Sequence, residues 1–486
     1  MRNAITTSIF TLVGATALLA GCPDRTISKV SPEQGRVETK DIPVTVNRDI
    51  DILFLVDDSP SMNDKQVNLA ANFPNFINVL STIPGGLPNV HIGVVTSDLG
   101  SKGADGTAGP SIGTAGNGGC LNNGGKNGNL QLGMATAADV TGTYLSDVAS
   151  GAMRQKNYSG DLAMTFGKMA RVGAGGCGFE QHLEAAKRAL NGNPANTNFL
   201  RPQAYLAIVF IQDEDDCSIE HATLLGPDVA TLGPLASFRC TRFGVICDVG
   251  GQTPDQMNSI GTKDQCHSNE NSQYLTKVGD YVTFFKSLKT DPSNIIVAGI
   301  RGVTTPVQTA SLPPSGGTGP NEPTLAHSCS YTGAPDPAHG NPSGLEVADP
   351  AVRLQFFLDQ FPNRSTATTI CQQDLSDALT VIAQLLKTVI GDPCIEGVLA
   401  DVDPNTPGPQ YDCSVSDVTN PGKANQTEVV LQACNAGNTN IPCWHLVLDA
   451  ANCSTTPTKL TLKIERNSIA PPDNTHVIAN CVTVAM

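Results

Sequence analysis

The stretch Asp51-Ile-Leu-Phe-Leu-Val-Asp57-Asp-Ser59-Pro-Ser61 joins an apolar run to a cluster of oxygen-bearing side chains. The apolar part has the length and composition of a buried β-strand. After it, a carboxylate and two hydroxyls occupy alternate positions, and such side chains point the same way in an extended backbone. Asp57, Ser59 and Ser61 are therefore candidate ligands for a hard divalent cation such as Mg2+, with Ca2+ or Mn2+ as alternatives.

The same residues also have a structural explanation, because Ser and Asp are common at helix N-caps. Apolar residues in Lys65–Leu80, just downstream, have helical spacing, and Pro74 is expected to kink or split that helix. The apolar strand in front of the motif makes a metal site the stronger interpretation.

Apolar runs similar to the first occur at Val90–Thr96, Ala204–Ile211 and Ile295–Ile300. They are rich in Val, Ile and Leu and do not alternate, as expected for parallel strands covered on both faces. Helical patterns alternate with these runs, so the sequence predicts an α/β fold with a doubly wound, mostly parallel sheet. Further helices are expected at Phe179–Leu190, at Leu375–Val389 and after Pro350.

Acidic residues follow three of the predicted strands. Asp57, Asp98 and Asp213 each stand just beyond a carboxyl end, where ligands bind in doubly wound sheets. We expect these three carboxylates to lie along one edge of the sheet.

Three segments do not fit the pattern of a compact α/β core. Leu99–Gly160 is rich in Gly and Asn, and Glu220–Ser272 carries three cysteines; both are predicted to be insertions on the ligand edge. Residues 394–486 contain six cysteines and an alternating run at Lys459–Glu465. They are predicted to form a small disulfide-rich β module.

The N-terminus has the pattern of a secretory signal. Arg2 precedes an apolar stretch that is shorter than the roughly 20 residues of a membrane span. The stretch ends in Leu19-Ala-Gly-Cys22, which resembles the lipobox of bacterial lipoproteins. The resemblance implies that residues 1–21 are removed and that Cys22 is acylated, and the polar residues 22–48 are then expected to form a tether. An ordinary cleaved signal with a coincidental cysteine is the alternative.

The remaining cysteines also indicate export. Apart from Cys22, 14 of the 15 cysteines remain, and none forms a CxxC pair. In an oxidising compartment the simplest account is up to seven disulfides. Pro23, in place of the Asp that retains some lipoproteins at the inner membrane, favours the outer membrane.

Charge and missing motifs exclude several function classes. A net charge of −15 argues against sequence-independent binding to nucleic acid or anionic lipid. The sequence has no HExxH motif, and the Gly-rich loop at Gly173–Gly178 lacks the Lys of a phosphate loop. An enzyme is therefore not expected.

Together these features make residues 49–393 similar to von Willebrand factor type A (VWA) domains. Asp57-x-Ser59-x-Ser61 resembles their metal-ion-dependent adhesion site. The lipobox, the run DEDDCS at 213–218 and the run GCGFEQHLEAA at 176–186 further resemble bacterial VWA lipoproteins. The resemblance implies that Asp213 contributes through a water molecule, and that an Asp or Glu of a protein partner completes the coordination.

One ligand of the family is missing, because the loop Gly173–Gly178 lacks the hydroxyl that the family places there. Glu180 is the nearest oxygen ligand and is predicted to replace it, although an acid in the first turn of a helix is the alternative. Asp58, Asp98 and Glu214 are candidates for the outer shell.

The other polar groups near this edge have simpler interpretations. A second cation held by Asp58 and the Glu214–Asp216 run is weighed against a solvated acidic loop, which is favoured. Asp98 is as well explained as a turn residue as it is by a place in the outer shell of the site. His182 is expected to face solvent.

The sequence thus predicts a lipid-anchored, extracytoplasmic protein that binds a protein or envelope partner through a divalent metal. One alternative is a scaffold lipoprotein whose VWA site is degenerate and holds no metal. A second is a hydrolase of envelope polymers that uses paired carboxylates as acid and base.

Overall fold

The computed structural model describes residues 36–43, 48–83, 86–150, 153–313, 319–339, 341–391 and the greater part of 394–484. The chain divides into two compact units. One is Val46–Asp392, and the other combines Pro393–Met486 with the segment up to Thr45. The signal segment and Cys22 lie outside the described residues.

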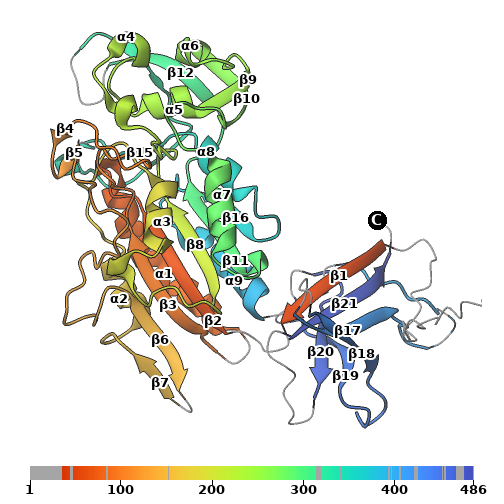
Figure 1. Ribbon diagram of the computed structural model, residues 1–486. Helices are drawn as coiled ribbons and strands as arrows, with labels where there is room; N and C mark the ends of the chain where they lie inside the picture. Colours follow the sequence, from red (N-terminus) through yellow and green to blue (C-terminus); the bar gives the residue numbers. More distant parts are fainter. Residues whose placement is uncertain are drawn as a thin grey trace, which may run out of the picture. The chain divides into compact units, whose positions relative to one another are not determined.

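A seven-stranded sheet forms the centre of the larger unit (Figure 1). In spatial order its strands are β16 (Ser365–Thr369), β11 (Ile295–Arg301), β8 (Tyr205–Ile211), β2 (Asp49–Val56), β3 (Asn89–Val95), β6 (Leu145–Ser150) and β7 (Met153–Lys156). The first five are parallel, whereas β6 and β7 are antiparallel. The predicted mostly parallel α/β sheet is confirmed, and so are its four predicted strands.

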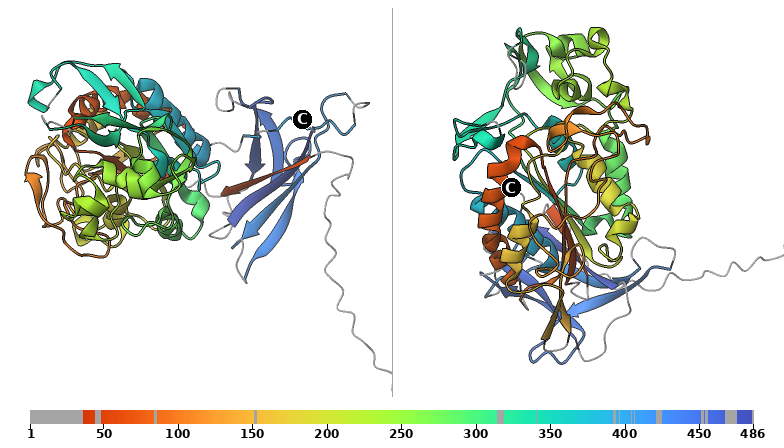
Figure 2. Two further views of the ribbon diagram at one scale, coloured as in Figure 1. Left: turned by 90° about the horizontal axis from the view of Figure 1, so that it is seen from above. Right: turned by 90° about the vertical axis from the view of Figure 1, so that its left-hand side faces the viewer.

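Helices cover both faces of this sheet, as the side view in Figure 2 shows. One face carries α1 (Asn63–Ser81), α2 (Leu162–Met169) and α9 (Ser376–Gly391). The other carries α3 (His182–Leu190), α7 (Val278–Ser287) and α8 (Val352–Leu358). An apolar core lies on each face of the sheet. Strand β2 contributes side chains to both cores, because its side chains alternate between the faces. Helix α1 continues through Pro74, so the predicted split of this helix is wrong.

Alternation along β2 is clear in its central residues. Phe54 packs against the rings of Phe73 and Phe166, with centroid distances of 5.6 and 4.7 Å. Leu53 and Leu55 belong to the core on the opposite face. All three side chains are fully buried. Burial on both sides fixes the register of β2 and therefore the place where Asp57 leaves the sheet.

The Glu220–Ser272 insertion folds beyond the carboxyl ends of the parallel strands (Figure 1). It forms α4 (Val229–Leu232), α5 (Phe238–Gly244), β9 (Val245–Val249), α6 (Pro254–Asn258) and β10 (Gly261–Ser268). With β12 (Val307–Leu312) and β13 (Glu322–Leu325) these strands make a four-stranded sheet. The disulfides Cys217–Cys240 and Cys247–Cys266 hold it.

Only part of the Leu99–Gly160 segment is an insertion. The hairpin of β4 (Ile112–Thr114) and β5 (Asn117–Cys120) lies outside the central sheet and is tied by the disulfide Cys120–Cys177. Strands β6 and β7, from the same segment, instead extend the central sheet. A second hairpin, β14 (Cys329–Thr332) and β15 (Leu345–Ala348), is linked to the sheet by Cys329–Cys371.

The smaller unit is the predicted disulfide-rich β module. Its six-stranded sheet has the order β1 (Arg36–Pro43), β21 (Thr475–Thr483), β17 (Cys413–Thr419), β18 (Thr427–Ala433), β19 (Cys443–Leu448) and β20 (Leu460–Glu465). The disulfides Cys394–Cys453, Cys413–Cys481 and Cys434–Cys443 staple it. With these, all seven expected disulfides are present. In the part of the chain that the structure describes, no helix has the length and apolarity of a membrane span.

Strand β1 corrects the prediction of a tether over residues 22–48. Arg36–Pro43 pairs with β21 in antiparallel register, from Arg36 opposite Thr483 to Pro43 opposite His476. The strand lies at the edge of its sheet, where short, charged strands are common because they resist pairing with other chains. Its polar composition therefore resembles that of a linker.

Hydrogen exchange tests the place of β1. In the full chain, the backbone amides of Arg36–Pro43 that face β21 should exchange slowly, because they are hydrogen-bonded in the sheet. Mass spectrometry of peptic peptides measures this, with β17 as the internal reference. Unprotected exchange over the whole segment would show that it is a free tether.

Candidate metal centre

The Asp57-x-Ser59-x-Ser61 motif lies where β2 ends, next to the end of β8. The Asp57 carboxylate is buried, and its Oδ1 accepts hydrogen bonds from the Ser59 amide (2.8 Å) and the Ser97 hydroxyl (3.2 Å). The hydroxyl oxygens of Ser59 and Ser61 are 3.1 Å apart. Ser59 is buried and Ser61 is exposed, so the group of three oxygens extends from the interior to the surface.

The alternative of a helix cap finds no support in this geometry. Ser59 precedes a short 3-10 helix, Pro60–Met62, which leads into α1. Its side chain makes no capping hydrogen bond to the backbone of that helix. The two hydroxyls therefore remain available to a ligand.

Asp213 follows β8, and its carboxylate faces the buried ammonium group of Lys65. Its Oδ2 lies 3.1 Å from the Lys65 ammonium, and neither oxygen accepts a well-oriented hydrogen bond from the described residues. The ammonium also lies 2.6 Å from Glu346 Oε2 and donates to the Ser61 carbonyl at 3.0 Å. Lys65 is only 1% exposed. Burial raises the pKa of Asp213, and the nearby ammonium opposes that rise.

Sequence reasoning missed both Lys65 and Glu346. Burial alone would lower the pKa of Lys65, but Asp213 and Glu346 outweigh it and raise this pKa overall, so the ammonium is charged. The only local signal was a lysine four residues after Ser61, on the buried face of the predicted helix. Glu346 is 281 residues away and gave no signal.

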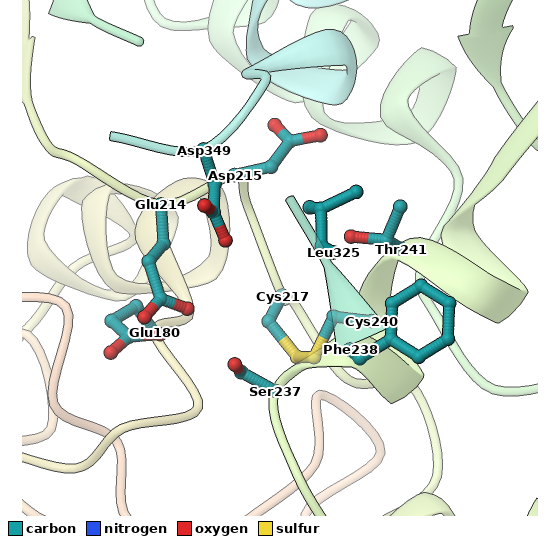
Figure 3. A pocket seen from close by; sticks show the side chains of 10 residues that line it. All are labelled: Glu180, Glu214, Asp215, Cys217, Ser237, Phe238, Cys240, Thr241, Leu325 and Asp349. Carbon is teal, nitrogen blue, oxygen red and sulfur yellow. A yellow bond between two sulfur atoms is a disulfide. The ribbon is translucent and has the colours of Figure 1, made fainter. Parts of the chain in front are cut away.

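Glu180 does not hydrogen-bond to the motif among the described residues. It lies just before α3, is 1% exposed, and its Oε1 is buried without a hydrogen-bond partner in the described part of the chain. It lines a pocket together with Glu214, which is half-buried (Figure 3). Burial and the nearby carboxylate of Glu214 raise the pKa of Glu180 well above its usual range.

His182 is buried, so the expectation of a solvent-facing side chain is wrong. Its Nε2 lies 3.3 Å from Asp57 Oδ2. The start of α3 packs against the carboxyl ends of the strands, which encloses the imidazole. His182 thus helps to position the carboxylate of the motif.

The candidates for the outer shell have partners of their own. Asp98 Oδ1 accepts a hydrogen bond from the Gly100 amide at 2.9 Å, as a turn residue does. Asp58 Oδ2 lies 2.5 Å from the Lys126 ammonium, which the Leu99–Gly160 segment supplies. Burial raises the pKa of Asp58 to about 7 despite this lysine.

Most of the acidic run after β8 is structural. Asp215 accepts hydrogen bonds from the amides of Arg353 (2.8 Å) and Leu354 (3.1 Å) at the start of α8. Asp216 pairs with the Arg353 guanidinium at 3.1 Å and accepts from the Leu183 amide at 2.9 Å. For Asp215 and Asp216, both interpretations made from the sequence, a solvated acidic loop and a cation site, are therefore wrong.

The donor set at the motif fits a magnesium-like cation. No group of three or more His, Cys, Asp or Glu side chains in the described ranges is arranged to hold a metal. A cation there would therefore be held by one or two carboxylates, the two hydroxyls and water. Mg2+ accepts such sets, because it retains several water ligands and needs few carboxylates.

The variant Lys65→Met tests whether the buried ammonium of Lys65 stabilises the fold. It leaves Asp213 and Glu346 buried without their ammonium, which should destabilise the metal-free protein by about 3–5 kcal/mol. Urea unfolding in EDTA measures the loss. The control is Lys168→Met, which removes a surface pair with Asp139 and should have no measurable effect. Equal stability of the two variants would contradict the role of Lys65.

The variant Asp58→Asn tests the buried carboxylate. Because the folded-state pKa of about 7 lies above the ordinary value of 3.8 for an aspartate, the folded protein binds this proton more tightly than the unfolded chain. Its contribution to stability is full below about pH 4 and is lost as the pH rises through about 7. Wild type and variant should therefore match near pH 4.

At pH 8 the Asn variant should be the more stable, by about 1.4 kcal/mol for each pKa unit of the shift. Urea unfolding at several pH values, in EDTA, measures the difference. A difference that stays constant from pH 4 to 8 would refute this account of Asp58.

No protein-family model matches the chain, and no curated protein matches it. Among solved structures, the chain is similar to the pilus adhesin SpaC from Lactobacillus rhamnosus GG, with 11% identity and a TM-score of 0.28. The match covers 92% of this chain and 41% of the adhesin, so the chain spans less than half the length of that protein. Similarity at this score supports no inference about fold or function.

Proposed function

We propose that the larger unit is a VWA-type domain that binds another macromolecule through a divalent cation at Asp57, Ser59 and Ser61. The observation that carries the proposal is the placement of this motif at the end of β2. Asp213 stands at the end of the neighbouring strand β8, with no well-oriented hydrogen bond from the described residues. A metal-bound water would donate to this carboxylate beside the Lys65 ammonium, which lies 3.1 Å from Oδ2.

Each residue then has a distinct role. Asp57 and the two hydroxyls would hold the cation, and Asp213 would accept a hydrogen bond from one of its waters. Because Ser61 is exposed, the cation would remain open to solvent on that side. A carboxylate of a partner protein would replace a water there, which makes binding both directional and metal-dependent. We propose binding and not catalysis, since the carboxylates of the site would serve the metal.

We further propose that the protein works outside the cytoplasm, held to the envelope by a lipid on Cys22. Seven disulfides support an oxidising compartment. The lipobox supports the anchor, and an acylated cysteine with two or more chains suffices for stable attachment.

A second candidate is a scaffold protein with the same fold and no metal. The contact between Lys65 and Asp213 favours it, because the ammonium already supplies positive charge beside the motif. The two candidates differ in whether the motif binds a cation at all.

Calorimetric titration of the full mature chain with Mg2+, Ca2+ and Mn2+ separates them. The proposal predicts a saturable site whose affinity falls at least tenfold in Asp57→Ala, because the central carboxylate is lost. The control is Asp49→Asn, at the opposite end of the same strand, which should bind as wild type does. Identical titrations of the wild type and Asp57→Ala would favour the scaffold.

A further inference from the structure

A second group of carboxylates faces a pocket beside the motif (Figure 3). Glu180 precedes α3, Glu214 follows β8, and Ser237 of the Glu220–Ser272 insertion lies on the far side. In Figure 3 the side chains of Glu180 and Glu214 extend toward each other. The pocket therefore lies where the insertion meets the strand ends.

This pocket contains negative charge without a matching cation. Glu180 is 1% exposed, and its Oε1 has no hydrogen-bond partner among the described residues. None of the described residues that line the pocket is basic. A buried carboxylate without a partner is costly, so such a group takes up either a proton or a cation.

Nearby basic side chains are already paired elsewhere. Lys65 contacts Asp213 and Glu346, and Arg353 contacts Asp216. An ion from solution is therefore the positive charge that remains available to the two glutamates.

We propose that Glu180 and Glu214 bind a second divalent cation, with Ca2+ the best fit. Two glutamates offer up to four oxygens, the Ser237 hydroxyl offers a fifth, and water completes the shell. Ca2+ takes about six to eight oxygen ligands in flexible geometry and readily accepts bidentate carboxylates. The ligands of this site differ from those of the motif, so the proposal holds whether or not the motif binds metal, although Asp57 and Asp213 lie close enough to interact electrostatically with both glutamates.

The other acids that line the pocket already have hydrogen-bond partners. Both oxygens of Asp215 accept amide hydrogen bonds from α8. Asp349 Oδ1 lies 2.6 Å from His327 Nδ1. The cation would therefore connect α3 and the end of β8 to the insertion, next to the disulfide Cys217–Cys240, which also lines the pocket. Its effect would be to stabilise the insertion over the strand ends.

Thermal unfolding and calorimetry of the full mature chain, with Ca2+ added after EDTA treatment, test the site. Ca2+ should raise the Tm of the wild type and of Asp57→Ala. In the Asp57→Ala background, where the motif is disabled, Glu180→Gln and Glu214→Gln should each lower the Ca2+ affinity at least tenfold and abolish the Tm shift. Gln keeps the shape of Glu and removes the buried charge, so these variants should remain folded in EDTA.

The control Asp264→Asn removes an exposed acid of the same insertion and should respond to Ca2+ as the wild type does. In the Asp57→Ala background, a Tm shift that survives both Gln substitutions would overturn the second site. The absence of any Ca2+ binding or Tm shift in Asp57→Ala itself would also overturn it, and would support the motif as the only Ca2+ site.

Discussion

Negative charge buried at the carboxyl end of the central sheet is the constraint on which the whole site depends. Six acids are buried there: Asp57, Asp58, Asp213, Asp215, Asp216 and Glu180. Three of them are matched by basic side chains, in the pairs Asp58–Lys126, Asp213–Lys65 and Asp216–Arg353. Asp57 instead receives neutral donors and His182, and Glu180 Oε1 has no partner in the described residues. Asp215 accepts amide hydrogen bonds from the start of α8. Asp57 and Glu180 mark the places where we propose cations.

The insertions contribute to this balance of charge. Lys126 comes from the Leu99–Gly160 segment, and Glu346 comes from the hairpin of β14 and β15. Disulfides tie both regions to the rest of the larger unit, which keeps the paired groups in place. Strand β1 precedes the larger unit in the sequence and β17 to β21 follow it, so the β module is built from both sides of that unit. A lipid on Cys22 would be attached to the chain ahead of the first described strand of that module.

Local features made much of the fold predictable from sequence. The four apolar strands and the Asp57-x-Ser59-x-Ser61 spacing are signals within single segments, and burial on both faces gave the strands a clear composition. Polar strands were missed for the same reason: β1 and β16 lie at sheet edges and carry little apolar sequence. The partners of the site depend on distant contacts. Lys65 meets Glu346 across 281 residues, and His182 is buried only because α3 packs against the strand ends.

The central claim is that the motif at the end of β2 holds a divalent cation. The most direct measurement is the anomalous scattering of Mn2+ in crystals of the full mature chain. The account predicts a peak within bonding distance of Asp57, Ser59 and Ser61, with Asp213 linked to it through water. A map without a peak there at saturating Mn2+, with Lys65 still paired to Asp213, would contradict it.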